Sequence, residues 1–504
     1  MKRFTKLFLS GASVALMAQA ANAQQALPQQ TDSYFVSAQQ ELFSKLAEQP
    51  NTGRAKNVIL FVLDGFSIPT LTAARIYEGQ SRGVDGESNV LSFEKLLPYV
   101  ALSKTYTHDS QVADSAPTAT AMTTGVKSLN GTIGVTQKVT LENCASQKGA
   151  EAESIFELAE KAGLSTGIIS TARITHATPA AAYAHTAFRD WESDATLSEE
   201  AKQNGCKDIA AQLIDWSAGN GFEVVLGGGR SNFLPESAAD PEAADKTGAR
   251  KDGRNLVDEW KAKYNDGAYV WNKTEFDAVD AEKTEHLFGL FERSHMQYEA
   301  DRAKDKGGEP SLAEMTGKAI DVLSKNKEGF VLMVEAGRID HAHHAGNAAR
   351  ALADTVAAAQ ALQVAYDKVN PQETLIVLTA DHSHTMTING YPKRNNPILG
   401  IAGTGDDKKP YTTLSYANGP GAKLDEPRPD LTNVDTTDLD FLQPALVPLG
   451  ESETHGGDDV AIFAAGPWAH LFRGVVEQNL IYHVMAYASQ LPSRVKAETT
   501  GAVK

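Results

Sequence analysis

The sequence predicts an α/β fold with a large, mostly parallel central sheet and helices on both of its faces. Apolar runs of strand length recur along the 504 residues, and stretches with helical periodicity separate them. Most of these runs are apolar at nearly every position, which is typical of strands buried on both faces of a parallel sheet. Acidic residues follow several of the runs directly, so we expect a site where the carboxyl ends of the strands meet.

The individual elements follow from the same patterns. Six apolar runs are expected to be buried strands, at residues 58–63, 165–170, 222–226, 330–334, 374–379 and 460–464. Helical patterns occupy residues 31–48, 151–162, 311–325 and 348–369. Two polar stretches, 231–267 and 389–453, carry no long apolar pattern and are interpreted as insertions, because loops of this length are usually functional or form interfaces.

The first 23 residues have the organisation of a secretory signal peptide. Lys2, Arg3 and Lys6 precede a short, mostly apolar core, and Ala21-Asn22-Ala23 forms a cleavage site before Gln24. The apolar core is shorter than the roughly 20 residues that a membrane helix needs, although a retained N-terminal anchor stays the alternative. We therefore expect a periplasmic or secreted protein without a membrane span, folded as one catalytic domain over residues 24–504.

Charge and cysteine content narrow the class of protein further. The formal net charge is −17, with 64 acidic and 47 basic residues, which argues against general nucleic-acid binding because that function needs a basic surface. Cys144 and Cys206 are the two cysteines of the chain. In an oxidising compartment two cysteines suggest one disulfide, with two free thiols as the alternative.

Clustered aspartates and histidines predict metal sites. In the segment RIDHAHH, Asp340 and His344 are four residues apart and share one face of a helix, with His341 close to that face. In DHSH, Asp381 and His382 follow an expected strand and can offer both side chains to one ion. Carboxylate and imidazole groups are both ligands for zinc. The remaining candidates are His455, beside two glycines, and the oxygen ligands Asp64 and Glu335.

One serine is a candidate nucleophile that metal ions at these sites could activate. Ser115 follows Asp114 in the segment VADSAPTAT, and only small residues come after it. Small residues would let a helix N-terminus approach a phosphate closely. Two histidine-containing sites suited to zinc and one oxygen-rich site suited to magnesium would favour phosphoryl transfer to this serine over proteolysis.

The order of the motifs resembles that of the alkaline phosphatase family, over nearly the whole mature chain. The segments NVILFVLDG, VADSAPTAT, ITHATPAAAYAHTAFR, MVEAGRIDHAHHAGN, LTADHSHT and ETHGGDDVAIFAAGP occur in the family's order and spacing. The resemblance implies hydrolysis of small phosphate monoesters, with Ser115 as the nucleophile that becomes a phosphoserine. It also implies that Arg189 binds the phosphate, and that Asp114 orients Arg189 or caps the helix.

The resemblance assigns the metal ligands residue by residue. It implies two Zn²⁺ and one Mg²⁺, with His176 and His341 beside them where some members have Asp and Lys. The first zinc would be held by Asp340, His344 and His455; the second by Asp64, Asp381 and His382; and the magnesium by Asp64, Thr178 and Glu335.

Further features are implied more weakly or depart from the common pattern. Leu63 stands where the family often has Gly, and Phe66-Ser67 replaces the usual Met-Gly. These departures affect the expected backbone conformation near Asp64 but not the assignment of Asp64 as a ligand. The pair Cys144 and Cys206 matches a family disulfide. The family usually forms homodimers, and residues 389–453 correspond to its interface or crown region. A calcium site of some members would here consist of Glu242, the carbonyl of Phe291, Glu292 and Glu309.

Parts of the sequence are also compatible with functions other than that of a secreted phosphomonoesterase. A phosphodiesterase of the same superfamily is the main alternative, although such enzymes often use Thr as the nucleophile. A sulfatase needs an Arg two residues after the Pro of its motif, and Ala119 stands there in this chain. A non-catalytic metal-binding protein would be expected to lack some of the ligands, yet the set is complete.

Overall fold

The computed structural model describes residues 27–423 and 427–495, and these divide into two compact units, 1–50 and 51–504. The expected signal peptide, residues 1–23, lies outside the described residues. In the first unit, helix α2 (Ser33–Ala47) begins after Asp32, whose side chain accepts hydrogen bonds from the N–H groups of Tyr34 and Phe35. The helix predicted at 31–48 is thus confirmed.

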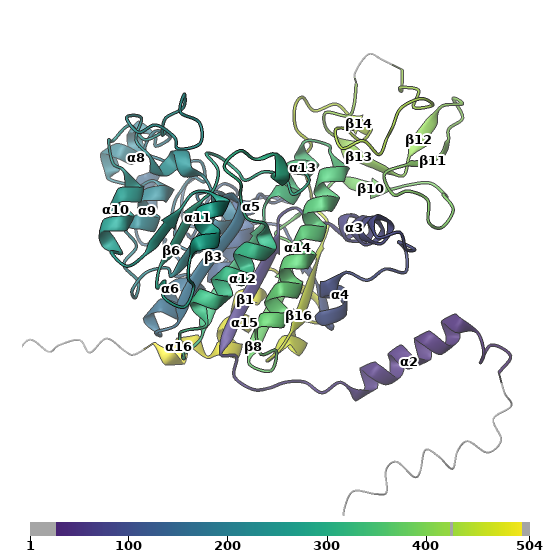
Figure 1. The fold of residues 1–504 in the computed structure, drawn as a ribbon, viewed down its shortest axis with the longest axis horizontal. Helices are drawn as coiled ribbons and strands as arrows, with labels where there is room; N and C mark the ends of the chain where they lie inside the picture. The colour runs from purple at the N-terminus through teal and green to yellow at the C-terminus, as the bar shows by residue number, and fades with distance from the viewer. Residues whose placement is uncertain (1–26, 424–426, 496–504) are drawn as a thin grey trace, which may run out of the picture. The chain divides into compact units, whose positions relative to one another are not determined.

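The second unit is built on a ten-stranded sheet with the order β17-β2-β16-β8-β1-β7-β3-β4-β6-β5 (Figure 1). All six predicted strands are present. The strands are β1 (Asn57–Leu63), β2 (Tyr99–Lys104), β3 (Ser165–Arg173), β4 (Val224–Gly228), β5 (Ala268–Val270), β6 (Leu287–Leu290), β7 (Phe330–Ala336), β8 (Thr374–Thr379), β16 (Val460–Ala465) and β17 (Gly474–Glu477).

Most neighbouring strands run parallel, as predicted, but β16 does not. It pairs antiparallel with both β8 and β2. Its residues are buried throughout, so its composition is that of a parallel strand and could not indicate its direction. The four strands that the sequence did not reveal are short or, like β2, alternate between exposed and buried side chains.

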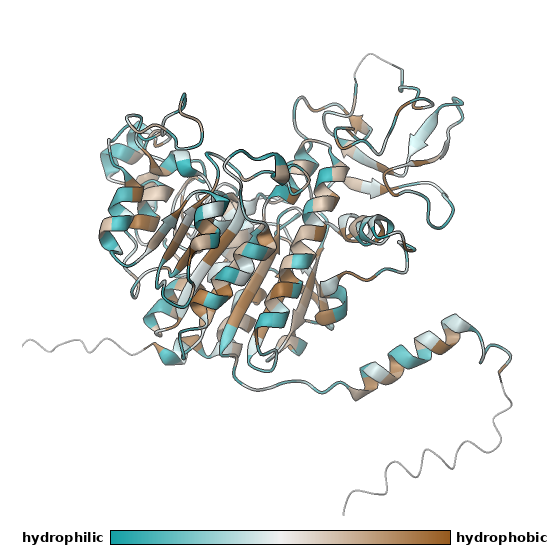
Figure 2. Cartoon of the chain, in the orientation of Figure 1, coloured by the Kyte–Doolittle hydropathy of each residue, from teal (hydrophilic) through white to brown (hydrophobic). Residues whose placement is uncertain are grey.

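Helices cover both faces of the sheet, and the alternation along β1 assigns its side chains to the two faces. Phe61 and Leu63 pack with the layer that contains α12 and α14, while Leu60 and Val62 pack with the layer of α5, α6 and α15. Figure 2 shows the apolar strands between helices whose outer faces are polar. The helices of this unit are α3 (Ile68–Ser81), α4 (Ser92–Leu96), α5 (Ser115–Thr124), α6 (Ile155–Lys161), α7 (Ala177–Ala180), α8 (Glu199–Asn204), α9 (Ile209–Ile214), α10 (Leu256–Lys263), α11 (Lys273–Ala278), α12 (Leu312–Leu323), α13 (Arg338–His344), α14 (Ala348–Lys368), α15 (Leu480–Ser489) and α16 (Leu491–Arg494). Among the described helices, none is long and apolar enough to cross a membrane.

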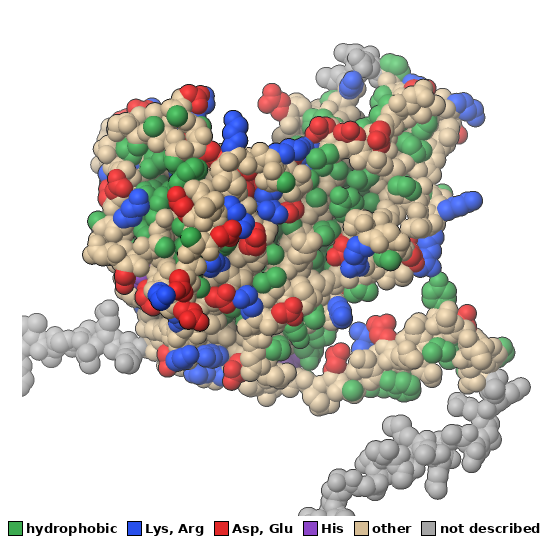
Figure 3. Space-filling view, in the orientation of Figure 1, with side chains coloured by type: hydrophobic (Ala, Val, Ile, Leu, Met, Phe, Trp, Pro, Cys, Tyr) green, Lys and Arg blue, Asp and Glu red, His purple; other side chains and the backbone are tan. Residues whose placement is uncertain are grey.

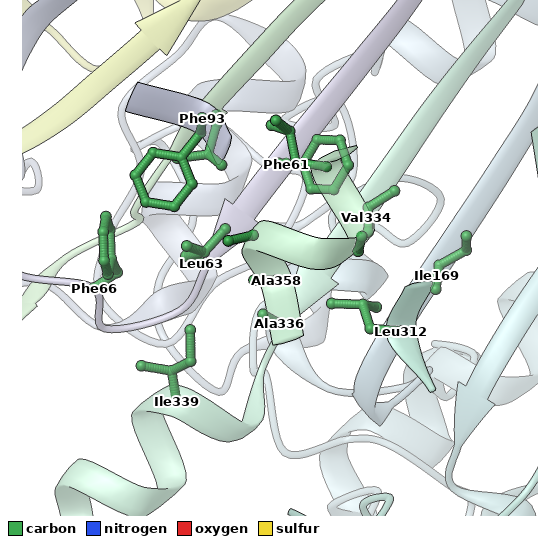
Figure 4. Close-up of a cluster of buried hydrophobic side chains, with 14 of the residues drawn as sticks. Phe61, Leu63, Phe66, Phe93, Ile169, Leu312, Val334, Ala336, Ile339 and Ala358 are labelled. Atoms are coloured by element: carbon green, nitrogen blue, oxygen red, sulfur yellow. The ribbon is translucent and has the colours of Figure 1, made fainter. Parts of the chain in front are cut away.

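The apolar core reaches directly to the end of the sheet where the expected site lies (Figure 4). Leu63, the last residue of β1, is fully buried, and so is Ile339, the second residue of α13. Both belong to the same buried cluster. Leu63 directly precedes Asp64 and Ile339 directly precedes Asp340, so two expected metal ligands are attached to residues that the core holds in place.

The two predicted insertions differ in structure. The stretch 231–267 contains α10, whose Trp260 is buried, and it brings Asp240 to the buried Arg230. In its described residues, 389–423 and 427–453, the second stretch contains short strands and no helix. Two of them, β13 (Leu414–Asn418) and β14 (Ala445–Val447), form a small sheet with β10 (Met386–Ile388), which directly precedes the stretch, and β11 (Ile401–Thr404) pairs with β12 (Pro410–Thr412).

A disulfide joins Cys144 to Cys206, which are 62 residues apart in the sequence and 6.1 Å apart between their Cα atoms. Closing a loop of this size restricts the unfolded chain and is worth about 4 kcal/mol by chain-entropy reasoning. The closed loop contains β3, α7 and Arg189, so the bond restrains a segment that carries several of the expected site residues.

Candidate functional site

The predicted site residues gather at the carboxyl ends of three adjacent strands, β8, β1 and β7. Asp64 follows β1, Asp381 follows β8, and Glu335 is the penultimate residue of β7. Helix α13 starts directly after β7 and presents Asp340 and His344 from successive turns. The three carboxylates at the strand ends are completely buried.

Ser115 is the first residue of α5 and is 2% exposed. Its Oγ lies 3.1 Å from Nε2 of His382 and 3.5 Å from Oδ1 of Asp64. The N-cap of α5 is Asp114, whose Oδ1 accepts the N–H of Ala116 at 2.6 Å. The nucleophile predicted from the sequence therefore sits at the positive end of a ten-residue helix, against two candidate metal ligands.

His382 joins the two aspartates predicted for the second zinc. Its Nε2 lies 3.4 Å from Oδ1 of Asp64 and 3.2 Å from Oδ2 of Asp381. Oδ1 of Asp381 accepts the N–H of Gly65 at 3.0 Å. Gly65 has a φ of +72°, and a Cβ there would lie 2.4 Å from the ring of His384, so this turn requires glycine.

Four side chains meet at the predicted first zinc site. Nε2 of His344 lies 3.4 Å from Oδ2 of Asp340, and Nε2 of His455 lies 3.4 Å from its Oδ1. The Nε2 atoms of His344 and His455 are 3.1 Å apart. The fourth member is His384, whose Nε2 is 2.6 Å from Oδ1 of Asp340. Ligand atoms of all four residues lie within 4.8 Å of one another, close enough to surround one ion.

A third group contains Asp64, Glu335 and His176, with ligand atoms within the same limit. Oδ2 of Asp64, Oε1 of Glu335 and Oγ1 of Thr178 are buried, and they have no hydrogen-bond partner in the described part of the chain. Buried oxygens of this kind are costly unless something satisfies them. Since all three are hard oxygen donors, they fit the magnesium ion that the sequence analysis assigned to them.

Arg189 contacts Asp114, the residue before Ser115, and is held on two sides. Its Nη1 donates to Oδ1 of Asp114 over 3.1 Å, and its Nη2 lies 3.0 Å from Nε2 of His176. Its backbone N–H donates to the carbonyl of Gly131 at 2.7 Å. The guanidinium thus links the cap of α5 to the third metal group.

Buried charges dominate the electrostatics. Burial and the nearby Asp381 raise the pKa of Asp64 well above its usual value, and burial raises the pKa of Glu335 to about 8. Burial and the neighbouring His455 hold the pKa of His382 well below its usual value. Carboxylates crowded in a buried site oppose one another's ionisation, so cations bound among them would restore their charged forms.

Comparison with known protein families identifies the family of this chain. Residues 55–491 match the family described as "Alkaline phosphatase". The chain belongs to the alkaline phosphatase family. It is 47% identical to the tissue-nonspecific alkaline phosphatase isozyme of Gallus gallus over 448 residues, which is 87% of this chain and 85% of that protein. It is 46% identical to the alkaline phosphatase of Gadus morhua, over 90% of this chain and 95% of that protein.

Solved alkaline phosphatase structures share the fold. The alkaline phosphatase of Thermus thermophilus superposes with a TM-score of 0.64 and is 25% identical, over 88% of this chain and 93% of that chain. The large, mostly parallel sheet with helices is therefore the fold of this alkaline phosphatase family, as the sequence analysis expected.

Sequence reasoning missed two histidines of the site. His384 lies in the quoted DHSH segment, and its spacing of two from His382 on an extended stretch was the available signal. His295 comes from the loop after β6, and its ring centroid lies 4.0 Å from that of His341 and 5.3 Å from that of His176. No pattern in the sequence connects His295 with the family motifs, so only the fold could bring it there.

The acids suggested for calcium lie together in part. Glu242 and Glu292 have ligand oxygens within 4.8 Å of each other and of Asp305, which the sequence analysis did not include. Glu309 lies outside that group, and burial together with the charges of Asp305 and Glu292 raises its pKa to about 9. The N–H of Phe291 donates to the carbonyl of Gly227, which fixes the backbone beside Glu292.

Proposed function

We propose that this alkaline phosphatase family member hydrolyses phosphate monoesters through a phosphoserine at Ser115, and releases inorganic phosphate and an alcohol. The observation that carries the proposal is the position of Ser115. Its Oγ faces His382 and Asp64 at the N-terminus of α5, and Asp114, the residue before it, accepts from the guanidinium of Arg189. A nucleophile, phosphate-binding groups and metal ligands are all needed for such a reaction, and here they occupy one buried site.

Three metal ions are assigned to the three groups of side chains. The unpartnered oxygens of Asp64, Asp381, Glu335 and Thr178 support this assignment. When bound, the ions would lower the pKa of the serine hydroxyl, neutralise the phosphate oxygens and stabilise the leaving oxygen. The first Zn²⁺ would be held by Asp340, His344 and His455, the second by Asp64, Asp381 and His382, and Mg²⁺ by Asp64, Thr178 and Glu335.

The chain's own groups account for the two displacements. In the first, Oγ of Ser115 forms a bond to phosphorus and its proton passes to water. The bond to the ester oxygen breaks, and that oxygen takes a proton from water as it leaves as the alcohol. In the second, a water oxygen attacks the phosphorus and the bond to Oγ breaks, which releases phosphate and restores the serine. Both displacements occur on the same phosphorus, so the groups that hold the phosphoryl oxygens serve twice.

Arg189 and the start of α5 would hold those oxygens. A guanidinium pairs two phosphate oxygens in a planar fork, and the free N–H groups at a helix N-terminus favour an anion. Asp114 accepts from both Arg189 and Ala116, so it fixes the orientation of the arginine relative to the helix. His176, which belongs to the third group, and His341, whose ring lies beside that of His176, would adjust this site through their rings. Both are half-buried, and desolvation lowers their pKa values, that of His341 to about 3.

We also propose that the protein is periplasmic or secreted and acts as a homodimer. The disulfide Cys144–Cys206 supports an oxidising compartment. Large apolar side chains lie exposed on the inserted region, among them Leu446 at 84% and Tyr391 at 102% of their maximal exposure. Figure 3 shows hydrophobic side chains on the visible surface of this region, at the upper right. Exposed apolar surface of this kind is typical of an interface.

We also propose a calcium site at the acidic group of Glu242, Glu292 and Asp305. Glu242, Glu292, Glu309 and the carbonyl of Phe291 were assigned to it by resemblance, and Asp305 forms one group with Glu242 and Glu292. Oδ2 of Asp305 and Oε2 of Glu309 are buried without a hydrogen-bond partner in the described residues. Oxygen ligands of this number and type suit Ca²⁺.

The experiment that tests the proposed function is a comparison of mono- and diester hydrolysis. Purified protein should hydrolyse p-nitrophenyl phosphate, lose this activity with a chelator, and regain it with zinc and magnesium. If bis-p-nitrophenyl phosphate is the faster substrate, the alternative of a phosphodiesterase replaces the proposal.

A further inference from the structure

The inserted region ends on a buried glutamate that contacts the first metal group. Glu453 is 1% exposed. Its Oε2 lies 2.5 Å from Nδ1 of His384, while its Oε1 accepts from the N–H of Thr385 at 2.7 Å and from Oγ1 of Thr385 at 2.5 Å. Both carboxylate oxygens are therefore engaged in hydrogen bonds, one of them with a member of the metal group.

His384 is bonded to a carboxylate at each ring nitrogen. Nδ1 faces Glu453, and Nε2 faces Oδ1 of Asp340 at 2.6 Å. Ionised carboxylates only accept hydrogen bonds, so both nitrogens of His384 must donate. A ring that donates from both nitrogens has no lone pair for a metal, which sets His384 apart from the other two histidines of the group.

The backbone of Glu453 orients a second histidine. Its carbonyl accepts from Nδ1 of His344 at 2.6 Å, and its N–H donates to the carbonyl of His344 at 2.8 Å. Because Nδ1 of His344 carries the hydrogen, the lone pair is on Nε2, the atom that faces Asp340. Glu453 thus determines which ring nitrogens carry a hydrogen in two histidines, His384 and His344, that both contact Asp340.

The fold holds Glu453 in this place from several directions. Strands β9 (Ser383–His384) and β15 (His455–Gly456) pair antiparallel, with His384 opposite His455. This short ladder joins the segment that enters the inserted region to the segment that leaves it. Gly419 packs so tightly against Glu453 that an added Cβ would lie 2.8 Å from that of the glutamate.

We propose that Glu453 is a positioning residue for the first zinc site, which rests on the proposed function. Through His384 it holds Asp340 with one oxygen directed at the ion, and through its backbone it presents Nε2 of His344. Carboxylates behind metal-bound ligands typically contribute ten- to a hundredfold to metal affinity. Through Glu453, the inserted region would thereby influence the zinc affinity of the first site.

Glu453→Gln tests this role, with Glu451→Gln as the matched control at an exposed position two residues away. The glutamine can still accept from Thr385, but its amide must donate to Nδ1 of His384, which then keeps a hydrogen only on Nε2. We expect zinc affinity at the first site, measured by competition with a chelator, to fall about ten- to a hundredfold, with the second site unchanged. Glu451→Gln should bind zinc like the parent protein.

The melting temperature of the metal-free protein separates positioning from mere structure. If Glu453 is a positioning residue, the metal-free Glu453→Gln variant should have a melting temperature close to that of the metal-free parent. Addition of zinc should raise the melting temperature of the variant less than that of the parent. Thr385→Val, which removes one bond to Oε1 but leaves the carboxylate, should lose much less zinc affinity than Glu453→Gln.

Unchanged zinc affinity in Glu453→Gln would overturn the inference, and so would an equal loss of melting temperature with and without zinc. If the parent protein itself bound no zinc, the proposed function would fail instead, which the same titration reports separately.

Discussion

Oδ1 of Asp114 accepts both the N–H of Ala116 and Nη1 of Arg189, at 2.6 and 3.1 Å. One carboxylate oxygen therefore joins the helix that carries Ser115 to the arginine proposed to bind phosphate. Asp114 is thus the side chain that ties Arg189 to the helix of Ser115, while His176 holds the other end of the guanidinium.

The first prediction concerns Asp114. Asp114→Asn keeps a good N-cap but loses the charged partner of Arg189. We expect the inhibition constant of inorganic phosphate to rise about tenfold, which corresponds to about 1.4 kcal/mol. Asp190→Asn is the matched control, because Asp190 is exposed and its contact with Arg189 is 3.9 Å long. Equal effects of the two substitutions would show that Asp114 does not orient the arginine.

The second prediction concerns Thr178, whose buried hydroxyl has no hydrogen-bond partner in the described residues. Thr178→Val preserves shape and removes an oxygen that is costly to bury without a ligand. We expect magnesium affinity to fall at least about tenfold, while the metal-free protein keeps or gains stability. Metal titration and thermal unfolding measure these two effects.

A contrasting substitution makes the second prediction specific. The hydroxyl of Thr175 donates to Glu192 at 2.6 Å, so Thr175→Val should destabilise the metal-free protein. If Thr178→Val also lowered the melting temperature of the metal-free protein, its hydroxyl would have a structural partner rather than an ion.

The third prediction concerns pH and a carboxylate pair remote from the metal groups. Burial and the neighbouring Glu223 raise the pKa of Glu160 to about 8. Its oxygens accept from Thr166 and from the N–H of Asn220. The folded state therefore holds a proton that the unfolded chain releases near pH 4.3, so stability is greatest below that pH and falls as pH rises toward about 8.

Glu160→Gln should remove this loss. We expect the melting temperature of the metal-free variant to fall less between pH 5 and pH 9 than that of the parent, by at least a few degrees. Glu153→Gln, at an exposed ion pair, should follow the parent curve. Parallel curves for Glu160→Gln and the parent would mean that the pair does not titrate in this range.

The elements that the sequence predicted best are those that a buried strand or a motif defines completely. Asp64 and Asp381 follow strands that are apolar except at their end residues, so their meeting at one edge of the sheet followed from the parallel topology. His384 and Glu453 depend instead on the pairing of β9 with β15 across the inserted region. That contact joins residues about 70 positions apart in the chain, and no local pattern encodes it. The direction of β16 escaped prediction for a similar reason, since burial on both faces gives the same composition in either direction.

The fourth prediction concerns the disulfide. The double variant Cys144→Ser/Cys206→Ser should lose up to about 4 kcal/mol of unfolding free energy, because the 62-residue loop is no longer closed in the unfolded chain. Urea unfolding of the variant and of the reduced parent should agree. If the double variant has the same unfolding free energy as the disulfide-bonded parent, then the unfolded chain already restricts this loop without the bond, which would contradict the prediction.

The chemical identity of the nucleophile is the point on which the proposed function depends most. The most direct measurement is mass spectrometry of the enzyme quenched with acid during turnover of a phosphate monoester, with Ser115→Ala as the comparison. We predict one phosphoryl group on the peptide that contains Ser115, and neither phosphorylation nor appreciable turnover in Ser115→Ala. Turnover that persists in Ser115→Ala, or a phosphoryl group on a different residue, would contradict the assignment of Ser115.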